Sequence, residues 1–308
     1  FLGKFTIQVQ IKTKGMKIVH RKRLQEFKYN QLLEQTPEAS IYNHLQYLDY
    51  LSDNVEFLIV GDYQAAMALP YTKRLNSKCL TNPVFSRVQD WLGPKPKDFT
   101  AIIKFLLERY DRCDFSIGNV MLEGEHVNKK VTQSIELAQN VHLNSQAKRN
   151  VKKLANQSYQ ITDMGKKEAL DHINSMLIFK VGGVRDIEVT RFNRLVHYFQ
   201  NPVIVAKGLY WENELLAIGL FVQWRNKYLY IKGTTTEAGR SYAAMQTLML
   251  NEIEWAKLEG LDFEFEGSNV PSVAQFNESF GAKNIEYINL NWDNSSGIFP
   301  LVRKLLGK

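Results

Sequence analysis

The chain has 308 residues, of which 44% are hydrophobic and 23% are charged. These values are typical of globular proteins, and the length suits two domains of ordinary size. No apolar run approaches the roughly 18 residues that a membrane-spanning helix needs. The two cysteines are too few for a disulfide framework, and no Cys/His spacing indicates a zinc site. We therefore expect a cytoplasmic protein without a metal.

The formal net charge is +7, and it is spread unevenly. Residues 1–160 contain 23 Lys and Arg against 15 Asp and Glu, whereas residues 161–308 contain 16 against 17. This excess favours an anionic partner for the first half, such as a nucleotide, a phosphorylated substrate or RNA. A lysine-rich, solvated surface explains the excess equally well.

The N-terminal residues 1–15 carry few organising signals, and Met16 has the position of a natural start. We treat residues 1–15 as an extension. Periodicity and turn signals in the first half predict helices over 25–34, 43–51 and 101–109 and strands over 55–60, 64–69, 114–122 and 134–138. Pro70 is expected to end its strand, and residues 71–98 are expected to be mainly loop.

Ser145 opens a basic helix, SQAKRNVKKLANQSY. Its cationic side chains share one broad face: Lys148, Arg149, Lys152 and Lys153. This face is either a docking surface for phosphates or a solvated surface. A second αβ pattern follows soon after, so we place a domain boundary here, with an N-terminal domain over 16–144 and a C-terminal domain over 145–308.

The second half predicts helices and strands in close succession. They are a helix over 187–199, strands over 203–206, 215–222 and 227–231, a long helix over 241–258, a strand over 261–265, a helix between Pro271 and Gly281, and a strand over 285–290. Ser268 or Asn269 is the expected cap of the helix at Pro271.

The polar segment KGTTTEAG, residues 232–239, follows a strand and precedes the long helix. Free backbone N–H groups and the helix dipole at such a place favour a phosphate. Arg240, at the expected start of that helix, opposes the dipole, and a bound phosphate would offset this. An ordinary polar turn that caps a helix remains the alternative.

The run from Gly233 into the long helix, followed by FEFEGSNVPSVAQFNESFGAK, resembles the C-terminal part of the GCN5-related N-acetyltransferase (GNAT) superfamily. The resemblance is to the branch of the Fem-type peptidoglycan-bridge aminoacyltransferases. Segments IYNHLQYLDYLS and GDYQAAMALP support it in the first half. It implies an α/β (α+β) protein with two tandem GNAT-like domains, each a mixed, mostly antiparallel sheet flanked by helices.

The resemblance places the acyl-donor site, for acetyl-CoA or another acyl-CoA, on residues around the KGTTTEAG segment. These are Thr234, Thr235, Thr236, Ala238, Gly239, Arg240 and Ser241. The superfamily's donor loop usually carries more glycines than this one. In many acetyltransferases a tyrosine four residues before the closing glycine acts as the acid. Here that position is Asn277, which fits the Fem branch better.

Two carboxylates, Glu264 and Glu266, alternate with aromatic residues in the predicted strand LDFEF and its continuation. They are expected to project to one side, into the gap where donor and acceptor meet in this fold. A buried carboxylate there could accept the proton of an amine. Glu266, nearer the end of the strand, is the preferred base, and a loop-bracing role is its alternative.

Three functions follow for the chain. The first is acyl transfer to an amine from acetyl-CoA, as in N-acetyltransferases. The second is Fem-type aminoacyl transfer from aminoacyl-tRNA to a peptidoglycan precursor. The third is a GNAT-like protein that has lost catalysis and binds an anionic ligand. The expected partners are an amine acceptor and, in the second case, tRNA, and a monomer is compatible with each.

Overall fold

The computed structural model describes residues 15–74, 77–136, 141–180, 184–266 and 270–294. Packing divides the chain into two compact units, Phe1–Lys130 with Tyr287–Lys308, and Val131–Glu286. The divisions fall inside two strands, β6 (Val127–Ile135) and β12 (Lys283–Asp293). Each of these strands thus begins in one unit and ends in the other, and residue 145, the predicted domain boundary, lies within the second unit.

The first unit contains strands on which three helices pack. Its other elements are β1 (Met16–His20), η2 (Arg21–Arg23), α1 (Glu26–Glu34), η3 (Ile41–Asn43), α2 (Leu45–Leu51), β2 (Val55–Val60), β3 (Ala65–Arg74), β4 (Ser77–Thr81), α3 (Thr100–Leu107) and β5 (Arg112–Ile117). The strand order is β1-β2-β3-β4-β5-β12. All neighbours are antiparallel except β4 and β5.

The second unit is built from the elements between β6 and β12. They are α4 (Ser145–Ala155), β7 (Gln160–Met164), α5 (Lys166–Lys180), α6 (Asp186–Tyr198), β8 (Ile204–Trp211), β9 (Glu214–Trp224), β10 (Lys227–Thr235), α7 (Glu237–Ser241), α8 (Ala244–Leu258), β11 (Asp262–Glu264) and α9 (Pro271–Glu278). The strand order is β7-β8-β9-β10-β11-β6, and only β10 and β11 are parallel.

The two units repeat one connectivity. In each, a first strand is followed by two helices, three antiparallel strands, a helical segment and a fifth strand parallel to the fourth. The sixth strand, antiparallel to the fifth, is β12 in the first unit and β6 in the second. This repeat confirms the mixed α/β class and the mostly antiparallel sheet.

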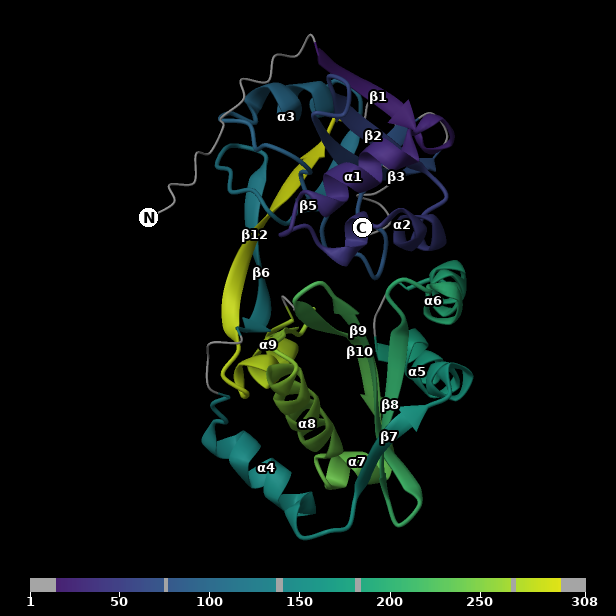
Figure 1. The fold of residues 1–308 in the computed structure, drawn as a ribbon, viewed down its shortest axis with the longest axis vertical. Coiled ribbons are helices and arrows are strands. Elements are labelled where there is room, and N and C mark those ends of the chain that lie inside the picture. Colours follow the sequence, from purple (N-terminus) through teal and green to yellow (C-terminus); the bar gives the residue numbers. More distant parts are fainter. Residues whose placement is uncertain (1–14, 75–76, 137–140, 181–183, 267–269, 295–308) are drawn as a thin grey trace, which may run out of the picture. The chain divides into compact units, whose positions relative to one another are not determined.

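Helices cover both faces of the second unit's sheet. In Figure 1, α8 and α4 lie on one side of β8, β9 and β10, and α5 lies on the other. Contacts of α8 and of α5 with β8, β9 and β10 agree with this arrangement. Leu154 of α4 joins Leu209, Leu216 and Leu248 in one apolar cluster, so α4 is held to α8 and to the sheet by burial.

Several predicted elements differ from the structure. Pro70 does not end its strand, because β3 continues to Arg74 after changing partner from β2 to β4. The predicted helix over 241–258 corresponds to α8, which begins only at Ala244, and a separate short helix, α7, precedes it; between them Ala243 has a left-handed φ of 52°. β1, β4, β7 and α5 were not predicted. The expected caps of α9, Ser268 and Asn269, lie outside the described residues.

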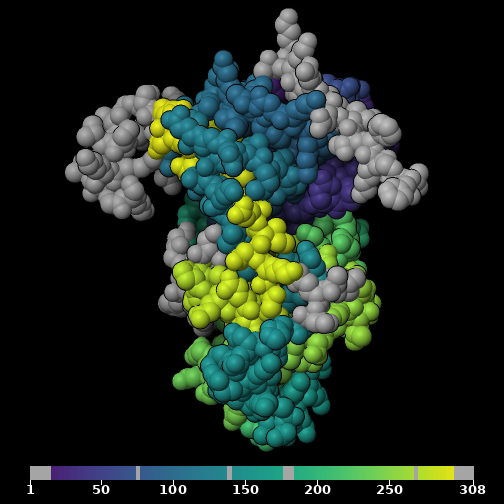
Figure 2. Space-filling model, turned by 90° about the vertical axis from the view of Figure 1, so that its left-hand side faces the viewer, coloured from purple at the N-terminus to yellow at the C-terminus, as the bar shows by residue number. Residues whose placement is uncertain are grey.

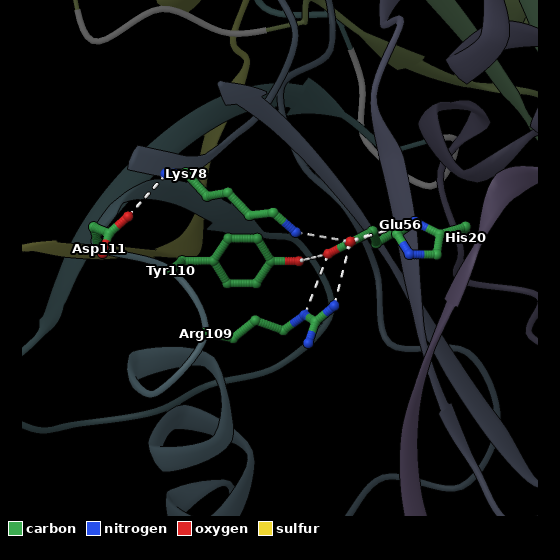
Figure 3. A network of polar contacts seen from close by, with 6 residues as sticks. All are labelled: His20, Glu56, Lys78, Arg109, Tyr110 and Asp111. Atoms are coloured by element: carbon green, nitrogen blue, oxygen red, sulfur yellow. Dashed lines mark hydrogen bonds and ion pairs between the residues drawn. The ribbon is translucent and has the colours of Figure 1, made fainter. Parts of the chain in front are cut away.

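A buried carboxylate ties together the strands of the first unit (Figure 3). The Glu56 side chain on β2 is fully shielded from solvent. It accepts hydrogen bonds from Lys78 Nζ at 2.9 Å, from Tyr110 Oη at 2.9 Å and from Arg109 at 3.3 Å. His20 Nδ1 lies 3.4 Å away. Burial alone would raise the pKa of Glu56, but the bonds from Arg109, Lys78 and Tyr110 outweigh it and hold that pKa below its ordinary value.

Replacement Glu56→Gln is expected to lower the free energy of unfolding at pH 7 by about 2 kcal/mol, because a neutral amide cannot satisfy these cations. This loss of stability is moderate because the side chains of Lys78 and Arg109 are partly exposed, so water can still solvate their charges. The depressed pKa stabilises the folded state above the unfolded value of about 4.3, and this contribution disappears as the pH falls through the folded pKa. Urea titrations between pH 7 and 2 measure both effects.

Glu26→Gln is the matched control, since Glu26 forms an exposed ion pair with Arg21. It should change stability by less than about 0.5 kcal/mol. The role given to Glu56 is contradicted if the Glu56→Gln protein has the stability of the wild type and loses stability at low pH in the same way.

Candidate functional site

The strands β10 and β11 are paired over only three residues. Lys227, Tyr228 and Leu229 lie beside Asp262, Phe263 and Glu264, in parallel register. β11 ends there, but β10 continues to Thr235 along its other neighbour, β9. The pairing of β10 with β11 therefore ends at Leu229, and we call the place between the second half of β10 and residues 265–266 the gap between the two strands.

A bulge in β10 determines which side chains face this gap from one side of the sheet. Between Tyr230 and Lys232 the register against β9 shifts by one residue. Leu229 and Lys232 thus oppose Val222 and Leu220, two residues apart on β9, and so share a face. By the same alternation Thr234 lies on the face of Leu229 and of its neighbour Glu264.

Thr234 carries a hydroxyl group without a partner. Its residue is 9% exposed, and among the described residues Oγ1 has no hydrogen-bond partner. A buried hydroxyl without a hydrogen bond costs free energy unless a ligand supplies one. This position, predicted as part of a donor site, therefore lies in a strand, and its hydroxyl oxygen is shielded from solvent.

Glu264, the second predicted carboxylate, is held in an ion pair. It is 4% exposed, and its Oε2 accepts from Lys227 Nζ at 3.0 Å. Lys227 stands on the neighbouring strand, two residues before the partner of Glu264. This contact fixes the carboxylate at the place where the two strands part, which suits a positioning role better than that of a base.

Glu266 lies two residues beyond the end of β11. Its φ of 56° is left-handed, so the strand alternation that placed both carboxylates on one side does not extend to it. Its Oε1 is shielded from solvent, and burial raises the pKa of Glu266 to about 8. A carboxylic acid with such a pKa exchanges protons near neutral pH, as a general base or acid must.

The predicted donor segment is not a loop. Thr234 and Thr235 belong to β10, Thr236 is the N-cap of α7, and Gly239 is buried within α7. Ala238 packs on the apolar cluster of α4 and α8. Arg240 and Ser241 are exposed.

Hydrogen bonds explain why α7 turns away from β11. The N–H of Thr236 donates to the Leu216 carbonyl of β9 at 3.0 Å, and the Thr236 hydroxyl accepts from Gly239 N–H at 3.0 Å. A Cβ on Gly239 would clash with the same Leu216 carbonyl. The glycine thus serves close packing of α7 on β9, and this packing leaves the gap between β10 and β11 uncovered by α7.

The charge of Arg240 has a different meaning from the one predicted. Because α7 is a separate helix, Arg240 lies in its last turn, where a cation is favourable. It gives no support for a bound phosphate. Next to it, the Ser241 carbonyl accepts from Lys153 Nζ of α4 at 3.0 Å, which brings the basic helix to the end of α7.

The basic helix α4 lies on the surface of the second unit. Figure 2 shows it in teal, facing the viewer. Asn144 caps it, and Ala147 and Leu154 are its buried contacts. The predicted cationic side chains are all exposed: Lys148, Arg149, Lys152 and Lys153. They form one cationic surface beside α7.

The first unit has the counterpart of the gap, but its own chain fills it. β4 and β5 also pair in parallel over three residues and then part. There the Asn82 side chain bonds to Ser116, accepting from its N–H at 2.6 Å. Gln89 N–H donates to the Ser116 carbonyl at 2.9 Å and forms a bridge with Ile117. In the first unit, bonds from the chain that follows β4 thus bridge the place where the two parallel strands part.

Asn277, at the position of the acetyltransferase tyrosine, is a structural residue. It is 2% exposed, and its Nδ2 donates to Gln133 Oε1 at 3.1 Å. Gln133 Nε2 donates in turn to Asn284 Oδ1 at 2.9 Å. The amide chain binds α9 to β6 and β12 and leaves no acid at this position.

A buried pair on the other face of the sheet was missed by sequence reasoning. The Tyr228 hydroxyl donates to Glu252 Oε2 of α8 at 2.9 Å. Burial raises the pKa of Glu252, which is 5% exposed. The sequence does indicate that this carboxylate is buried, since Glu252 falls on the apolar stripe of α8 beside Met249 and Ile253.

Across the described part of the chain, no group of three or more His, Cys, Asp and Glu has the arrangement to hold a metal ion. The helices of that part include none with the length and apolarity to cross a membrane.

Neither a scan against protein-family models nor a search of curated proteins gives a match for this sequence. Solved structures do match the fold. FemX superposes with a TM-score of 0.59 at 9% identity, over 95% of this chain and 100% of that one. The C-terminal domain of a putative lysylphosphatidylglycerol synthetase from Agrobacterium fabrum gives 0.55 at 10% identity, over 91% and 95%.

A tandem GNAT protein from the clavulanic acid biosynthesis pathway gives a TM-score of 0.53 at 10% identity, over 92% of this chain and 99% of that one. The chain therefore has a GNAT-like fold of the kind seen in FemX. At such identities the likeness concerns the fold alone.

Gly239→Ala is expected to lower the free energy of unfolding by about 1 to 3 kcal/mol without any ligand, because the new methyl group meets the Leu216 carbonyl. Thermal and urea denaturation measure this loss. Gly165→Ala is the control, since a methyl group added there has no atom within 4 Å and its change should stay below about 1 kcal/mol. Equal stability of wild type and Gly239→Ala would show that the glycine serves a ligand instead.

Proposed function

We propose that the chain is an acyl- or aminoacyltransferase that forms an amide bond with an amine acceptor in the gap between β10 and β11. The observation that carries the proposal is the parting of β10 and β11, next to which half-buried Glu266, two residues beyond β11, has a carboxyl group whose pKa burial raises to about 8. We further infer two tandem GNAT-like domains, of which the second performs the reaction. The repeated connectivity and the filled gap of the first unit support this division.

In the proposed reaction, the carboxylate of Glu266 accepts a proton from the acceptor's ammonium group. The neutral amine attacks the carbonyl carbon of the donor, a C–N bond forms, and the bond from that carbon to the leaving oxygen or sulfur breaks. The nitrogen loses its second proton as the leaving group is protonated. Thr234 Oγ1 would donate its hydrogen bond to a donor oxygen, and Glu264 with Lys227 would hold the strand end.

For the donor, an aminoacyl ester carried on RNA is favoured over acyl-CoA. Coenzyme A needs free amides for its pyrophosphate, but the N–H groups of Thr236, Gly239 and Arg240 are bonded within the chain. The cationic surface of α4 beside α7 is complementary to an RNA backbone. Among the fold neighbours, the C-terminal domain of a putative lysylphosphatidylglycerol synthetase, whose name gives a lysyl-lipid product, agrees with aminoacyl transfer. A peptidoglycan precursor is the proposed acceptor.

The experiment compares radiolabelled acetyl-CoA with a pool of radiolabelled aminoacyl-tRNA as donors, with a uridine-diphosphate muropeptide as the acceptor. Label transfer from tRNA supports the proposal. Transfer from acetyl-CoA alone would reassign the donor, and transfer from neither, with binding of the muropeptide retained, would favour a protein without catalysis.

The rate with a working donor should depend on the pH through Glu266. Its pKa of about 8 means that roughly a tenth of the carboxyl groups are ionised at pH 7, so kcat/KM should rise with pH and level off above about 8. Glu266→Gln should lower kcat/KM by about 100-fold or more and remove this limb. A pH–rate profile of both proteins measures the effect.

Glu259→Gln is the matched control, because Glu259 is an exposed carboxylate at the end of α8. It should leave the profile unchanged. If Glu266→Gln keeps the rising limb, another group is the base.

Charge reversal on α4 tests the donor. The double variant Lys148→Glu, Lys152→Glu should weaken tRNA binding by about tenfold or more near 0.1 M salt. The affinity should also depend less steeply on salt, because fewer phosphate contacts release fewer counterions on binding. Filter binding at several salt concentrations measures both. Lys97→Glu, an exposed lysine of the first unit, is the control and should have a much smaller effect. Equal effects from both sites would mean that only net charge matters.

A further inference from the structure

A cavity of about 450 Å³ lies on the face of the second unit's sheet that α8 covers. Its lining includes Tyr228 of β10 and Trp255 of α8, so it is on the opposite side of the sheet from Glu264 and Thr234. The acyl-transfer reaction proposed above uses no residue of this cavity. Its size suits a ligand of the dimensions of one nucleotide.

One wall of the cavity is aromatic and open to solvent. Trp255 is a large aromatic side chain of α8, and 40% of it is exposed to solvent. Its ring lies 4.7 Å from that of Tyr228, and the Tyr228 hydroxyl is held by its bond to Glu252. The wall is thus fixed in place, and it presents apolar ring surface on which a planar group could stack.

The opposite part of the lining is charged. Lys207 Nζ lies 2.8 Å from Asp163 Oδ1, and the Asp163 side chain is 79% exposed. Arg225 stands in the tight turn between β9 and β10, with a left-handed φ of 57°. The lining therefore combines two cations with one carboxylate that keeps most of its surface in contact with water.

Gln223 adds an exposed amide to the same lining. An amide both donates and accepts hydrogen bonds, which matches the edges of nucleobases. A carboxylate such as Asp163 is the usual partner of ribose hydroxyl groups in nucleotide sites. Arginine and lysine provide for phosphate.

We propose that this cavity binds a nucleotide, with the base stacked on Trp255 and read by Gln223, the ribose at Asp163, and the phosphate at Arg225 and Lys207. Each part of a nucleotide meets a group of matching chemistry within one cavity of matching volume. Inorganic phosphate would leave the aromatic wall exposed, and an amino acid with an aliphatic side chain would leave Gln223 without a partner. The nucleotide is either free or the end of a single-stranded RNA.

Isothermal titration of the full chain with AMP, GMP, CMP and UMP tests the proposal. At least one should bind, and Trp255→Ala should weaken its binding by about tenfold or more, the loss expected for one base stack. Arg225→Gln should also weaken binding and should reduce its dependence on salt. Leu258→Ala is the control, since Leu258 is an 86% exposed residue of the same helix that does not line the cavity.

The melting temperatures of the variants ensure that a loss of binding is not a loss of folding, and Arg225→Gln serves if Trp255→Ala unfolds. A single-stranded trinucleotide that binds more tightly than the mononucleotide would identify an RNA end as the source, and equal affinity would identify a free nucleotide. The proposal is overturned if no mononucleotide binds at millimolar concentration, if Trp255→Ala and Leu258→Ala behave alike, or if inorganic phosphate or lysine binds as tightly as the nucleotides.

Discussion

The short parallel contact between β10 and β11 is the constraint on which the proposed site depends. Three paired residues hold the strands together, and beyond them each strand has another neighbour, β9 for β10 and β6 for β11. Parallel pairs need long crossover connections, here through α7 and α8, so the two strands are not forced together by a hairpin. The sheet can therefore open at this place while its remaining pairings keep it stable.

What becomes of such a gap depends on the segment that follows the fourth strand. In the second unit, Thr236 N–H bonds that segment to the Leu216 carbonyl of β9, on the far side of β10, and Gly239 packs closely against the same carbonyl. In the first unit, Asn82 and Gln89 fasten it to β5 instead, and the gap is filled. One connectivity thus gives two outcomes, and a few backbone hydrogen bonds decide between them.

The sequence predicted the elements whose residues obey one clear periodicity. The continuous apolar run of β2 and the capped helix α4 have nearly the predicted bounds. β4, in contrast, is a short strand whose pairing depends on a distant segment, β5, so local composition did not indicate it. The break at Ala243 escaped prediction because alanine favours helix, so its residue type gives no sign of a left-handed backbone.

The candidate site shows the same division. Glu264, Glu266 and Thr234 were recognised by residue type, and all three lie at the ends or edges of the parting strands. Their roles could not be assigned from sequence, since the sequence does not show that Lys227 on another strand pairs with Glu264 or that burial raises the pKa of Glu266. The left-handed backbone at Glu266 costs about 1 kcal/mol for a residue with a Cβ. For the base proposed above this turn has a use, because it takes Glu266 out of the strand alternation, and burial raises the pKa of its carboxyl group.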